Sequence, residues 1–324
     1  MNSVHAYRAP RWLPGGHAQT IYPVLFAPRP RVLYRRERWT TPDGDFVDVD
    51  WAEDRRAATS PERDVPLVVL FHGLEGNSRS HYAMSLMHAV LNAGWRGVVV
   101  HFRGCSGEPN RLPRAYHSGD SAEIDWMLRR LANTAPVLYA AGVSLGANAL
   151  LLWLGERAEE ATRLVARAAA VSAPLDLMAA GNALDRGFNL VYTRHFLRSL
   201  RRKAIAKLAH HPGLYTGRAV ARTRTLREFD DLYTAPLHGY RNTDDYWTRA
   251  SSKPVLRRIA VPTLVLNARN DPFLPAATLP AAAEVSSAVA LEQPAEGGHV
   301  GFVSGRFPGT LAWLPSRLIA YFRH

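Results

Sequence analysis

The sequence predicts an α/β fold, with a mostly parallel twisted sheet, an N-terminal antiparallel hairpin, helices on both faces and a helical cap insertion. Three observations predict it. Two strand-like segments near the N-terminus flank a turn, apolar runs then alternate with helical stretches, and one long helical interval interrupts the alternation. With 324 residues and 47% hydrophobic residues, the chain can bury this core as a single domain over 1–324.

The hairpin is predicted by the segments 31–40 and 46–52, which are rich in β-forming residues. They flank Pro42-Asp43-Gly44-Asp45, a sequence typical of a tight turn. The segment 53–64 that follows is polar, and we expect it to form an exposed loop.

The parallel strands are predicted by continuous apolar runs, which are typical of strands covered on both faces. These runs lie at 66–73, 97–104, 136–146, 164–174, 261–271 and 288–299. Helical stretches lie at 80–93, 119–133, 146–158 and 309–322. Strands that alternate with helices in this way pair in parallel through right-handed crossovers.

The alternation breaks over about 176–256, which we interpret as a helical cap inserted over the C-terminal edge of the sheet. A basic amphipathic segment, RHFLRSLRRKAIAKL, occupies 194–208. Leu197, Leu200, Ile205 and Leu208 lie on or near one face of this helix. We expect that face to pack over a pocket, and transient contact of the cations with an anionic membrane surface is the alternative.

The sequence Gly142-Val143-Ser144-Leu145-Gly146 stands at the end of a buried strand and the start of a helix. In this setting G-x-S-x-G predicts a tight turn that raises the serine hydroxyl above the sheet. Both glycines are needed because side chains there would clash across the turn. Ser144 is therefore the predicted nucleophile, and it needs a base to take its proton.

The base and the orienting acid are expected after later strands, in the chain order Ser, Asp or Glu, His. Asp271 directly follows one apolar run, and His299 follows the next, after two glycines that let the loop turn back. Glu296 is a weaker rival acid because it lies too near His299 in sequence. The predicted catalytic residues are Ser144, Asp271 and His299.

The oxyanion of a tetrahedral intermediate needs fixed N–H donors. We expect one from Leu145, directly after the nucleophile, and a second from Leu74 in the loop after the first parallel strand. His72 lies in the turn before Leu74, and His101, inside a strand, is expected to belong to the core.

Cys105 is the only cysteine, so the chain has neither an internal disulfide nor a cysteine metal cluster. It lies outside any nucleophile turn, and we expect it to be inert. Arg103 in the same loop is expected to anchor that loop, and contact with an anionic substrate is the alternative. We expect no metal and no cofactor.

The net charge is +12, with 40 Lys and Arg against 28 Asp and Glu. The cations are scattered and no nucleic-acid-binding motif accompanies them, so we expect no nucleic-acid partner. We also expect no obligate protein partner. No apolar run is long enough to span a membrane, and the N-terminus lacks the apolar core of a secretory signal, so we expect a cytoplasmic location.

Longer motifs identify the chain further. They are Gly16-His17-Ala18-Gln19-Thr20-Ile21, PDGDFVDVDW at 42–51, FHGLEGNS at 71–78, HFRGCSGEPNR at 101–111, YHSGD at 116–120, GVSLGAN at 142–148, REFDDL at 227–232, DPF at 271–273 and GGHVGF at 297–302. With these motifs the chain resembles the α/β-hydrolase superfamily, and within it the YheT-like branch of AB hydrolase family 4. The eukaryotic relatives of that branch are abhydrolase-domain lipid and ester hydrolases. The resemblance implies a Ser-Asp-His triad at Ser144, Asp271 and His299, activity on esters, and no cofactor.

The predicted function is hydrolysis of a carboxylic ester, of a short or medium acyl group or of a lipid, through an acyl-enzyme on Ser144. An acyltransferase would use the same triad. A non-catalytic ligand-binding protein on the same scaffold is the alternative from another class, because fold alone does not define function.

Overall fold

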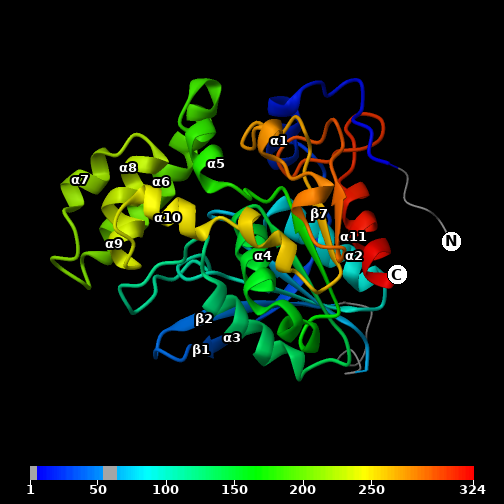
Figure 1. Cartoon of the computed structure of the whole chain (residues 1–324), viewed down its shortest axis with the longest axis horizontal. Coiled ribbons are helices and arrows are strands. Elements are labelled where there is room, and N and C mark those ends of the chain that lie inside the picture. The colour runs from blue at the N-terminus through cyan, green and yellow to red at the C-terminus, as the bar shows by residue number, and fades with distance from the viewer. Residues whose placement is uncertain (1–5, 54–63) are drawn as a thin grey trace.

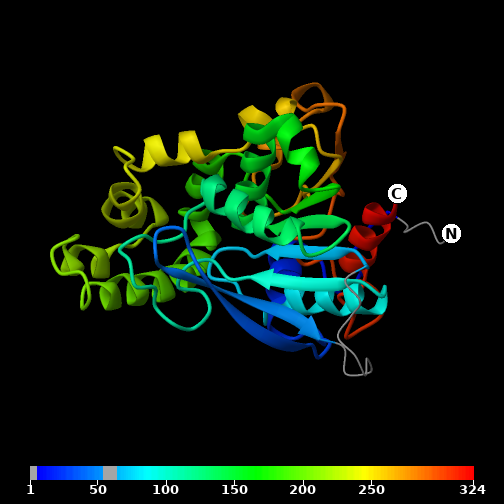
Figure 2. The same cartoon turned by 90° about the horizontal axis from the view of Figure 1, so that it is seen from below.

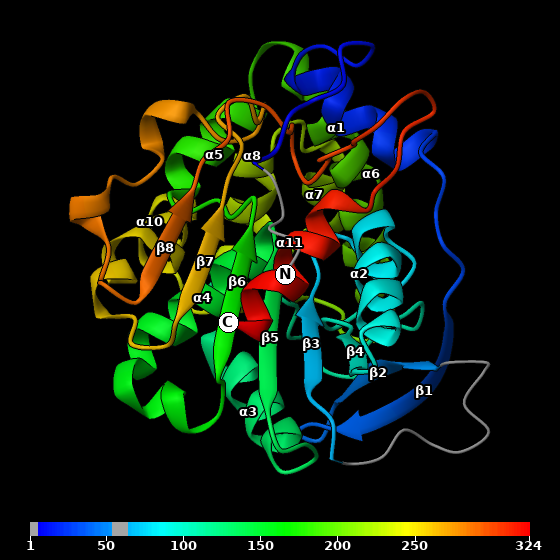
Figure 3. The same cartoon turned by 90° about the vertical axis from the view of Figure 1, so that its right-hand side faces the viewer.

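The computed structural model describes residues 6–53 and 64–324 and contains an eight-stranded sheet (Figure 1). The strands are β1 (Leu33–Thr40), β2 (Phe46–Glu53), β3 (Leu67–Phe71), β4 (Arg96–Val100), β5 (Leu138–Val143), β6 (Arg167–Val171), β7 (Thr263–Leu266) and β8 (Val289–Glu292). Their order in the sheet is β1-β2-β4-β3-β5-β6-β7-β8. Figure 3 shows the strands fanned out by the twist of the sheet.

The predicted fold class is confirmed. β1 pairs antiparallel with β2, and β2 pairs antiparallel with β4, while the remaining neighbours pair in parallel. The hairpin closes with Thr40 opposite Phe46, around the turn that the sequence predicted. The expected exposed loop at 53–64 lies almost entirely outside the described residues.

Helices cover both faces of the sheet, as the continuous apolar strands require. In β3, Leu67, Val69 and Phe71 pack into one hydrophobic core, and Val68 and Leu70 pack into the other. The first core is closed by α3 (Ser121–Ala132) and α4 (Leu145–Arg157). The second core is closed by α2 (His81–Asn92) and α11 (Trp313–Arg323).

A helix that the sequence analysis did not predict, α1 (Gly16–Leu25), precedes the hairpin. It begins after Gly15 and contains Pro23, and both residues weaken a helix prediction made from sequence alone. Its buried residues include Gln19 and Thr20, which are polar. This burial indicates that α1 makes specific contacts with the rest of the molecule.

Between β6 and β7 the described secondary structure is helical. The principal helices are α5 (Leu177–Leu184), α6 (Leu190–Lys207), α7 (Gly217–Arg222), α8 (Leu226–Phe229), α9 (Ala235–Leu237) and α10 (Thr243–Ala250). We call residues 177–250 the cap segment. It lies at one end of the molecule, beside the sheet (Figures 1 and 2). Its helices share a separate hydrophobic core, to which Phe273 and Leu274 also contribute.

The basic segment 194–208 forms most of α6, and one expectation about its packed face is wrong. Leu197 and Ala204 are completely buried, seven residues apart on the same side of the helix. Ile205 is 44% exposed because it follows Ala204 by one residue and so points about 100° away. The packed face of α6 therefore does not include Ile205.

Candidate active site

Ser144 lies at the turn between β5 and α4 and has the backbone angles φ 52° and ψ −119°. A Cβ atom on Gly142 would come within 2.6 Å of the Cα atom of Ala147, and one on Gly146 would collide with the Phe71 carbonyl oxygen. The Ser144 N–H donates to the carbonyl of Val171 on the neighbouring strand, at 2.9 Å. The two glycines thus permit a strained turn that projects the serine hydroxyl, as predicted.

The structure brings together Ser144, His299 and Asp271, the three residues that the sequence predicted as a group. The Ser144 Oγ atom lies 3.0 Å from His299 Nε2, and His299 Nδ1 lies 2.8 Å from Asp271 Oδ2. The other Asp271 oxygen accepts the N–H of Phe273 at 2.8 Å. Because the carboxylate accepts a hydrogen bond from Nδ1, the Nε2 atom is left free to accept the serine proton.

The loop that carries His299 is held by α1. The His299 N–H donates to Thr20 Oγ1, and the Gly297 N–H donates to Gln19 Oε1, both at 2.9 Å. Gly298 has φ +61°, and a Cβ atom there would lie 2.8 Å from the backbone of Gln19. The two glycines before His299 therefore allow both the turn and the close approach to α1.

Gln19 also joins the histidine loop to the acid loop, because its Oε1 atom accepts from Asn270 Nδ2 at 2.9 Å. Asn270 directly precedes Asp271, so one buried glutamine fixes both loops. The sequence analysis assigned no role to Gln19 or Thr20. The feature that could have pointed to them is the motif at residues 16–21, which was used only as support for the family resemblance.

Glu296, the rival acid, faces Gln19 rather than His299. Its Oε1 atom accepts from Gln19 Nε2 at 3.3 Å. Asp271 is thus the carboxylate that contacts the histidine.

Both ring nitrogens of His72 are engaged with the backbone, and Cys105 is buried. His72 Nδ1 donates to the Gly73 carbonyl at 2.8 Å, and Nε2 accepts the Phe102 N–H at 3.1 Å. Burial, with the nearby His101, lowers the pKa of His72 to about 3. Burial raises the pKa of Cys105 to about 12, so its thiol stays protonated at neutral pH.

The loop after β3 passes against Ser144, since a Cβ atom on Gly73 would lie 3.1 Å from the Ser144 Cβ atom. Its Gly73 and Glu75 N–H groups donate to the hydroxyls of Tyr82 and Tyr116, both at 2.9 Å. The Gly76 N–H donates within the loop, to the Gly73 carbonyl.

The N–H of Leu74, between these bonded amides, has no acceptor among residues 6–53 and 64–324. Leu145 is the first residue of α4, where a backbone N–H points out of the helix without an intrahelical partner. The two donors predicted for the oxyanion hole are therefore available beside Ser144. Their role in binding an oxyanion stays a prediction.

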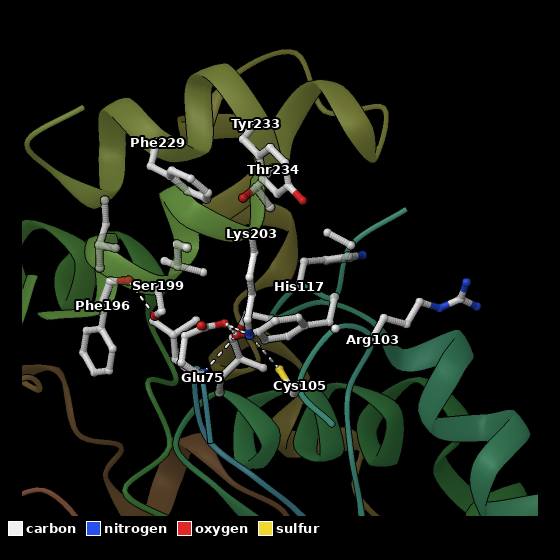
Figure 4. Close-up of a pocket in the computed structure, with 18 of the residues that line it drawn as sticks. Glu75, Arg103, Cys105, His117, Phe196, Ser199, Lys203, Phe229, Tyr233 and Thr234 are labelled. Carbon is white, nitrogen blue, oxygen red and sulfur yellow. Dashed lines mark hydrogen bonds and ion pairs between the residues drawn. The ribbon is translucent and has the colours of Figure 1, made fainter. Parts of the chain in front are cut away.

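A cavity of about 1110 Å³ opens at Ser144 and His299 and extends under the cap segment. Its apolar lining includes Leu177, Leu184, Leu226, Phe229, Trp247 and Phe273. Figure 4 shows Phe229 and Tyr233 projecting from the cap, with Glu75 and Cys105 on the opposite side. The shape and chemistry suit a ligand with an apolar portion.

An ion pair links the cap to the loop after β3: the Lys203 Nζ atom on α6 lies 2.8 Å from Glu75 Oε1 (Figure 4). Glu75 has φ 56°, a left-handed conformation that is uncommon for a residue with a side chain. The Tyr116 hydroxyl accepts the Glu75 N–H and donates to Glu75 Oε1, both at 2.9 Å. Burial raises the pKa of Tyr116 well above its usual value, which keeps it a donor. Tyr116 and Lys203 therefore fix the residue next to Leu74.

Arg103 anchors its loop, as expected. It is buried, and it pairs with Glu123 at 2.6 Å, Asp43 at 2.9 Å and Asp45 at 3.3 Å.

Among the described residues, His, Cys, Asp and Glu side chains nowhere gather in a group of three that could hold a metal ion. No helix in the described part of the chain has the length and apolar character needed to cross a membrane.

A serine on a strand-to-helix turn, hydrogen-bonded to a histidine and an aspartate from later loops of a parallel sheet, defines the class of α/β hydrolases. The family comparison agrees, since the family described as "alpha/beta hydrolase fold" matches residues 66–305. The chain belongs to this family.

Relatives place it more closely in the YheT-like branch, which confirms the resemblance. The chain is 42% identical to YheT of Escherichia coli K12 over 307 residues, covering 93% of this chain and 88% of YheT. It is 31% identical to Phospholipase ABHD3 of mouse over 305 residues, covering 92% of this chain and 73% of that protein.

Solved structures show the same fold. An esterase from Exiguobacterium antarcticum has a TM-score of 0.56 at 17% identity, covering 89% of this chain and 99% of the esterase. The Pyrococcus furiosus esterase Pf2001 has a TM-score of 0.53 at 15% identity, covering 92% and 98%.

Proposed function

We propose that this protein hydrolyses carboxylic esters that carry an apolar acyl group, through an acyl-enzyme on Ser144. The observation that carries the proposal is the hydrogen-bond chain from Ser144 through His299 to Asp271, at the mouth of a cavity with an apolar lining. The names of a relative, Phospholipase ABHD3, and of the esterases with the same fold support an ester-directed reaction.

In the first half of the reaction, His299 Nε2 takes the proton of the Ser144 hydroxyl while Oγ forms a bond to the acyl carbon. Asp271 holds the imidazole through Nδ1 and stabilises the imidazolium that forms. The carbonyl oxygen gains negative charge, and the N–H groups of Leu74 and Leu145 donate to it. The bond to the alcohol oxygen then breaks, and His299 returns the proton to the departing alcohol.

In the second half, His299 Nε2 takes a proton from water while the water oxygen attacks the acyl carbon. The bond between the acyl group and Ser144 Oγ breaks, and Oγ recovers the proton from His299. The carboxylic acid leaves through the cavity. The net reaction consumes one water and yields one acid and one alcohol, without a cofactor.

The substrate is proposed to be a short- or medium-chain ester or a lipid ester. The apolar cavity wall from α5, α8 and α10 would remove the acyl chain from water, at about 25 cal/mol per Å² of buried apolar surface. Turnover is therefore expected to rise with acyl length until the chain fills the space beneath the cap.

The direct test is reaction with a fluorophosphonate probe, with a p-nitrophenyl ester series measured in parallel. Mass spectrometry is expected to find the adduct on the peptide that contains Ser144, and free acid is expected as the product of ester turnover. The control replaces a serine outside the site: Ser286, whose hydroxyl donates to the Ile259 carbonyl in the wild type. The variant Ser286→Ala should react with the probe as the wild type does. A folded wild-type protein with no adduct and no turnover would overturn the proposal in favour of a ligand-binding protein.

Replacing Tyr116 with phenylalanine is expected to lower kcat about 10-fold with little change in KM, because a small displacement of a catalytic group costs one to two orders of magnitude. The variant loses both Tyr116 hydrogen bonds to Glu75, including the one to its backbone N–H, while the Lys203 ion pair remains, so the neighbouring Leu74 N–H is less firmly directed. Steady-state kinetics with p-nitrophenyl acetate, which is too short to use the cap, measure the effect.

The control for this variant is Tyr215→Phe, which removes a cap hydroxyl that bonds the Ala204 carbonyl. It should leave kcat unchanged. A trifluoromethyl ketone inhibitor, whose adduct places an oxyanion beside Ser144, should bind Tyr116→Phe about 10-fold more weakly. Unchanged kcat and inhibition in Tyr116→Phe would exclude a positioning role.

A further inference from the structure

An exposed apolar surface lies at the C-terminal end of α1. It is formed by Trp12, Tyr22, Val24, Leu25, Phe26 and Phe307, and we call it the α1 patch. Leu25, Phe26 and Phe307 are 63%, 66% and 73% exposed. Large apolar side chains that gather in one exposed place usually mark a contact surface.

The α1 patch is supported by hydrogen bonds and by a small hydrophobic core. Trp12 Nε1 donates to the Gly305 carbonyl at 3.0 Å, and the Tyr22 hydroxyl donates to the Pro308 carbonyl at 2.9 Å. These bonds join α1 and the segment before it to the loop that leads into α11, and Figure 3 shows the helix and the loop next to each other at the edge of the molecule. Beneath them lies a small core of Leu13, Ala27, Val303 and Leu311. The exposed side chains are therefore held outward on a packed support.

The segments that build the patch carry positive charge only. The first acidic residue of the chain is Glu37 and the last is Glu296, so the segments 1–36 and 297–324 contain no Asp or Glu. Arg11, Arg29 and Arg306 adjoin the patch and are exposed. None of the three forms an ion pair with any residue that the structure describes, and Arg29 Nη2 donates to the carbonyl of Val24 within the patch.

We propose that the α1 patch docks the protein onto an anionic lipid surface. Aromatic side chains interleaved with arginines suit the boundary between headgroups and acyl chains, where apolar groups enter and cations meet phosphates. Anionic lipid adds about 1 kcal/mol of attraction per nearby arginine. A second copy of the chain fits less well, because a two-fold interface would oppose arginines to arginines without an intervening acid.

This location differs from the basic helix that the sequence analysis considered for lipid contact. On α6, Lys203 faces Glu75, and Lys207 Nζ donates to the carbonyls of Leu112 and Arg114 at 2.9 and 3.1 Å. Two of the helix's cations are thus turned into the molecule. Beside the α1 patch the arginines are exposed next to apolar side chains that are 63–73% exposed, more than Val191 and Ile205 on α6 at 49% and 44%.

Docking would act on a helix that contacts both the histidine loop and the cap. The same helix that carries the patch holds His299 through Thr20, and His17 Nδ1 lies 3.1 Å from the Tyr192 hydroxyl on α6. The α1 patch is thus connected to both the histidine loop and the cap. The proposal does not depend on the reaction, and it is tested on the inactive Ser144→Ala protein so that vesicles stay intact.

The experiment is co-sedimentation of the full chain with vesicles of phosphatidylcholine alone or of an equimolar mixture with phosphatidylglycerol. Binding is expected only to the anionic vesicles and should fall as salt rises. The double variant Phe26→Ser/Phe307→Ser should lower partitioning at least about 10-fold, because two aromatic side chains lose their apolar environment. Arg29→Gln and Arg306→Gln should each lower it about 5-fold.

Two control variants test whether the α1 patch is the part of the protein that binds the vesicles. Leu232→Ser removes a cap leucine that is 38% exposed beside Asp231, and it should bind like the parent protein. Arg198→Gln/Arg202→Gln removes exposed cations of α6 and should have less effect than the patch variants. Loss of binding in the α6 variant alone, or no binding to either vesicle, would overturn the proposal. A free dimer that Phe26→Ser converts to a monomer would also overturn it, since the patch would then be a subunit interface.

Discussion

Replacement of Ser144 with alanine is expected to lower kcat for p-nitrophenyl ester hydrolysis about 10⁶-fold, because the attacking oxygen is lost while the cavity and the N–H donors remain. The surviving rate would come from substrate binding and oxyanion stabilisation alone. Steady-state kinetics on protein freed of wild-type contamination measure this effect. Thermal unfolding should be nearly unchanged, because the Ser144 backbone N–H keeps its bond to Val171.

Residues that act as one unit show non-additive losses, which provides an internal check. The double variant Ser144→Ala/His299→Ala should be no slower than Ser144→Ala alone, within a few-fold. Ser286→Ala should retain full turnover. Hydrolysis by Ser144→Ala within about 10-fold of the wild type would mean that another group performs the attack.

Replacement of Arg103 with methionine is expected to destabilise the protein by about 3–5 kcal/mol, the cost of leaving buried charges unpaired. The side chain of Arg103 is 3% exposed, and its guanidinium group forms ion pairs with Asp43, Asp45 and Glu123. Burial and the nearby Asp120 already raise the pKa of Glu123 to about 7, even with the arginine present. Chemical unfolding with urea, followed by tryptophan fluorescence, measures the loss.

The pH dependence of this loss follows from the sign of the pKa change. Without Arg103 the pKa of Glu123 in the folded state should rise further above its value in the unfolded chain. A carboxyl group with a raised folded-state pKa destabilises the protein as pH rises, so the deficit should be larger at pH 8 than at pH 5. The control is Arg129→Met, which breaks half-exposed ion pairs with Asp125 and Glu160 and should cost no more than about 1 kcal/mol. Equal losses in the two variants would contradict the assigned role of Arg103.

The candidate site was predictable where local sequence dictates geometry. The turn at Ser144 needs glycines on both sides, and the strand-to-helix setting is visible as an apolar run followed by a helical stretch. Asp271 and His299 each follow a strand, and the carboxyl ends of parallel strands meet at one edge of the sheet. Their approach to Ser144 therefore follows from the order of the strands.

The contacts that hold the site were not predictable, because they join residues far apart in the chain. Thr20 and His299 are separated by 279 positions, and Glu75 and Lys203 by 128. No periodicity or turn signal encodes such pairs. In the same way, the sequence indicated that α6 is amphipathic, but the neighbouring helices of the cap decide that Ala204 is buried and Ile205 is not.

The bonds from α1 to the histidine loop have a consequence for protein engineering. The family match begins at residue 66, whereas Gln19 and Thr20 lie well before it. A shortened chain that began at the matched region would retain the serine, the aspartate and the histidine but would lose the brace that orients the last of them. For the same reason, exchange of the segment before residue 66 between relatives is expected to change kcat without altering Ser144, Asp271 or His299.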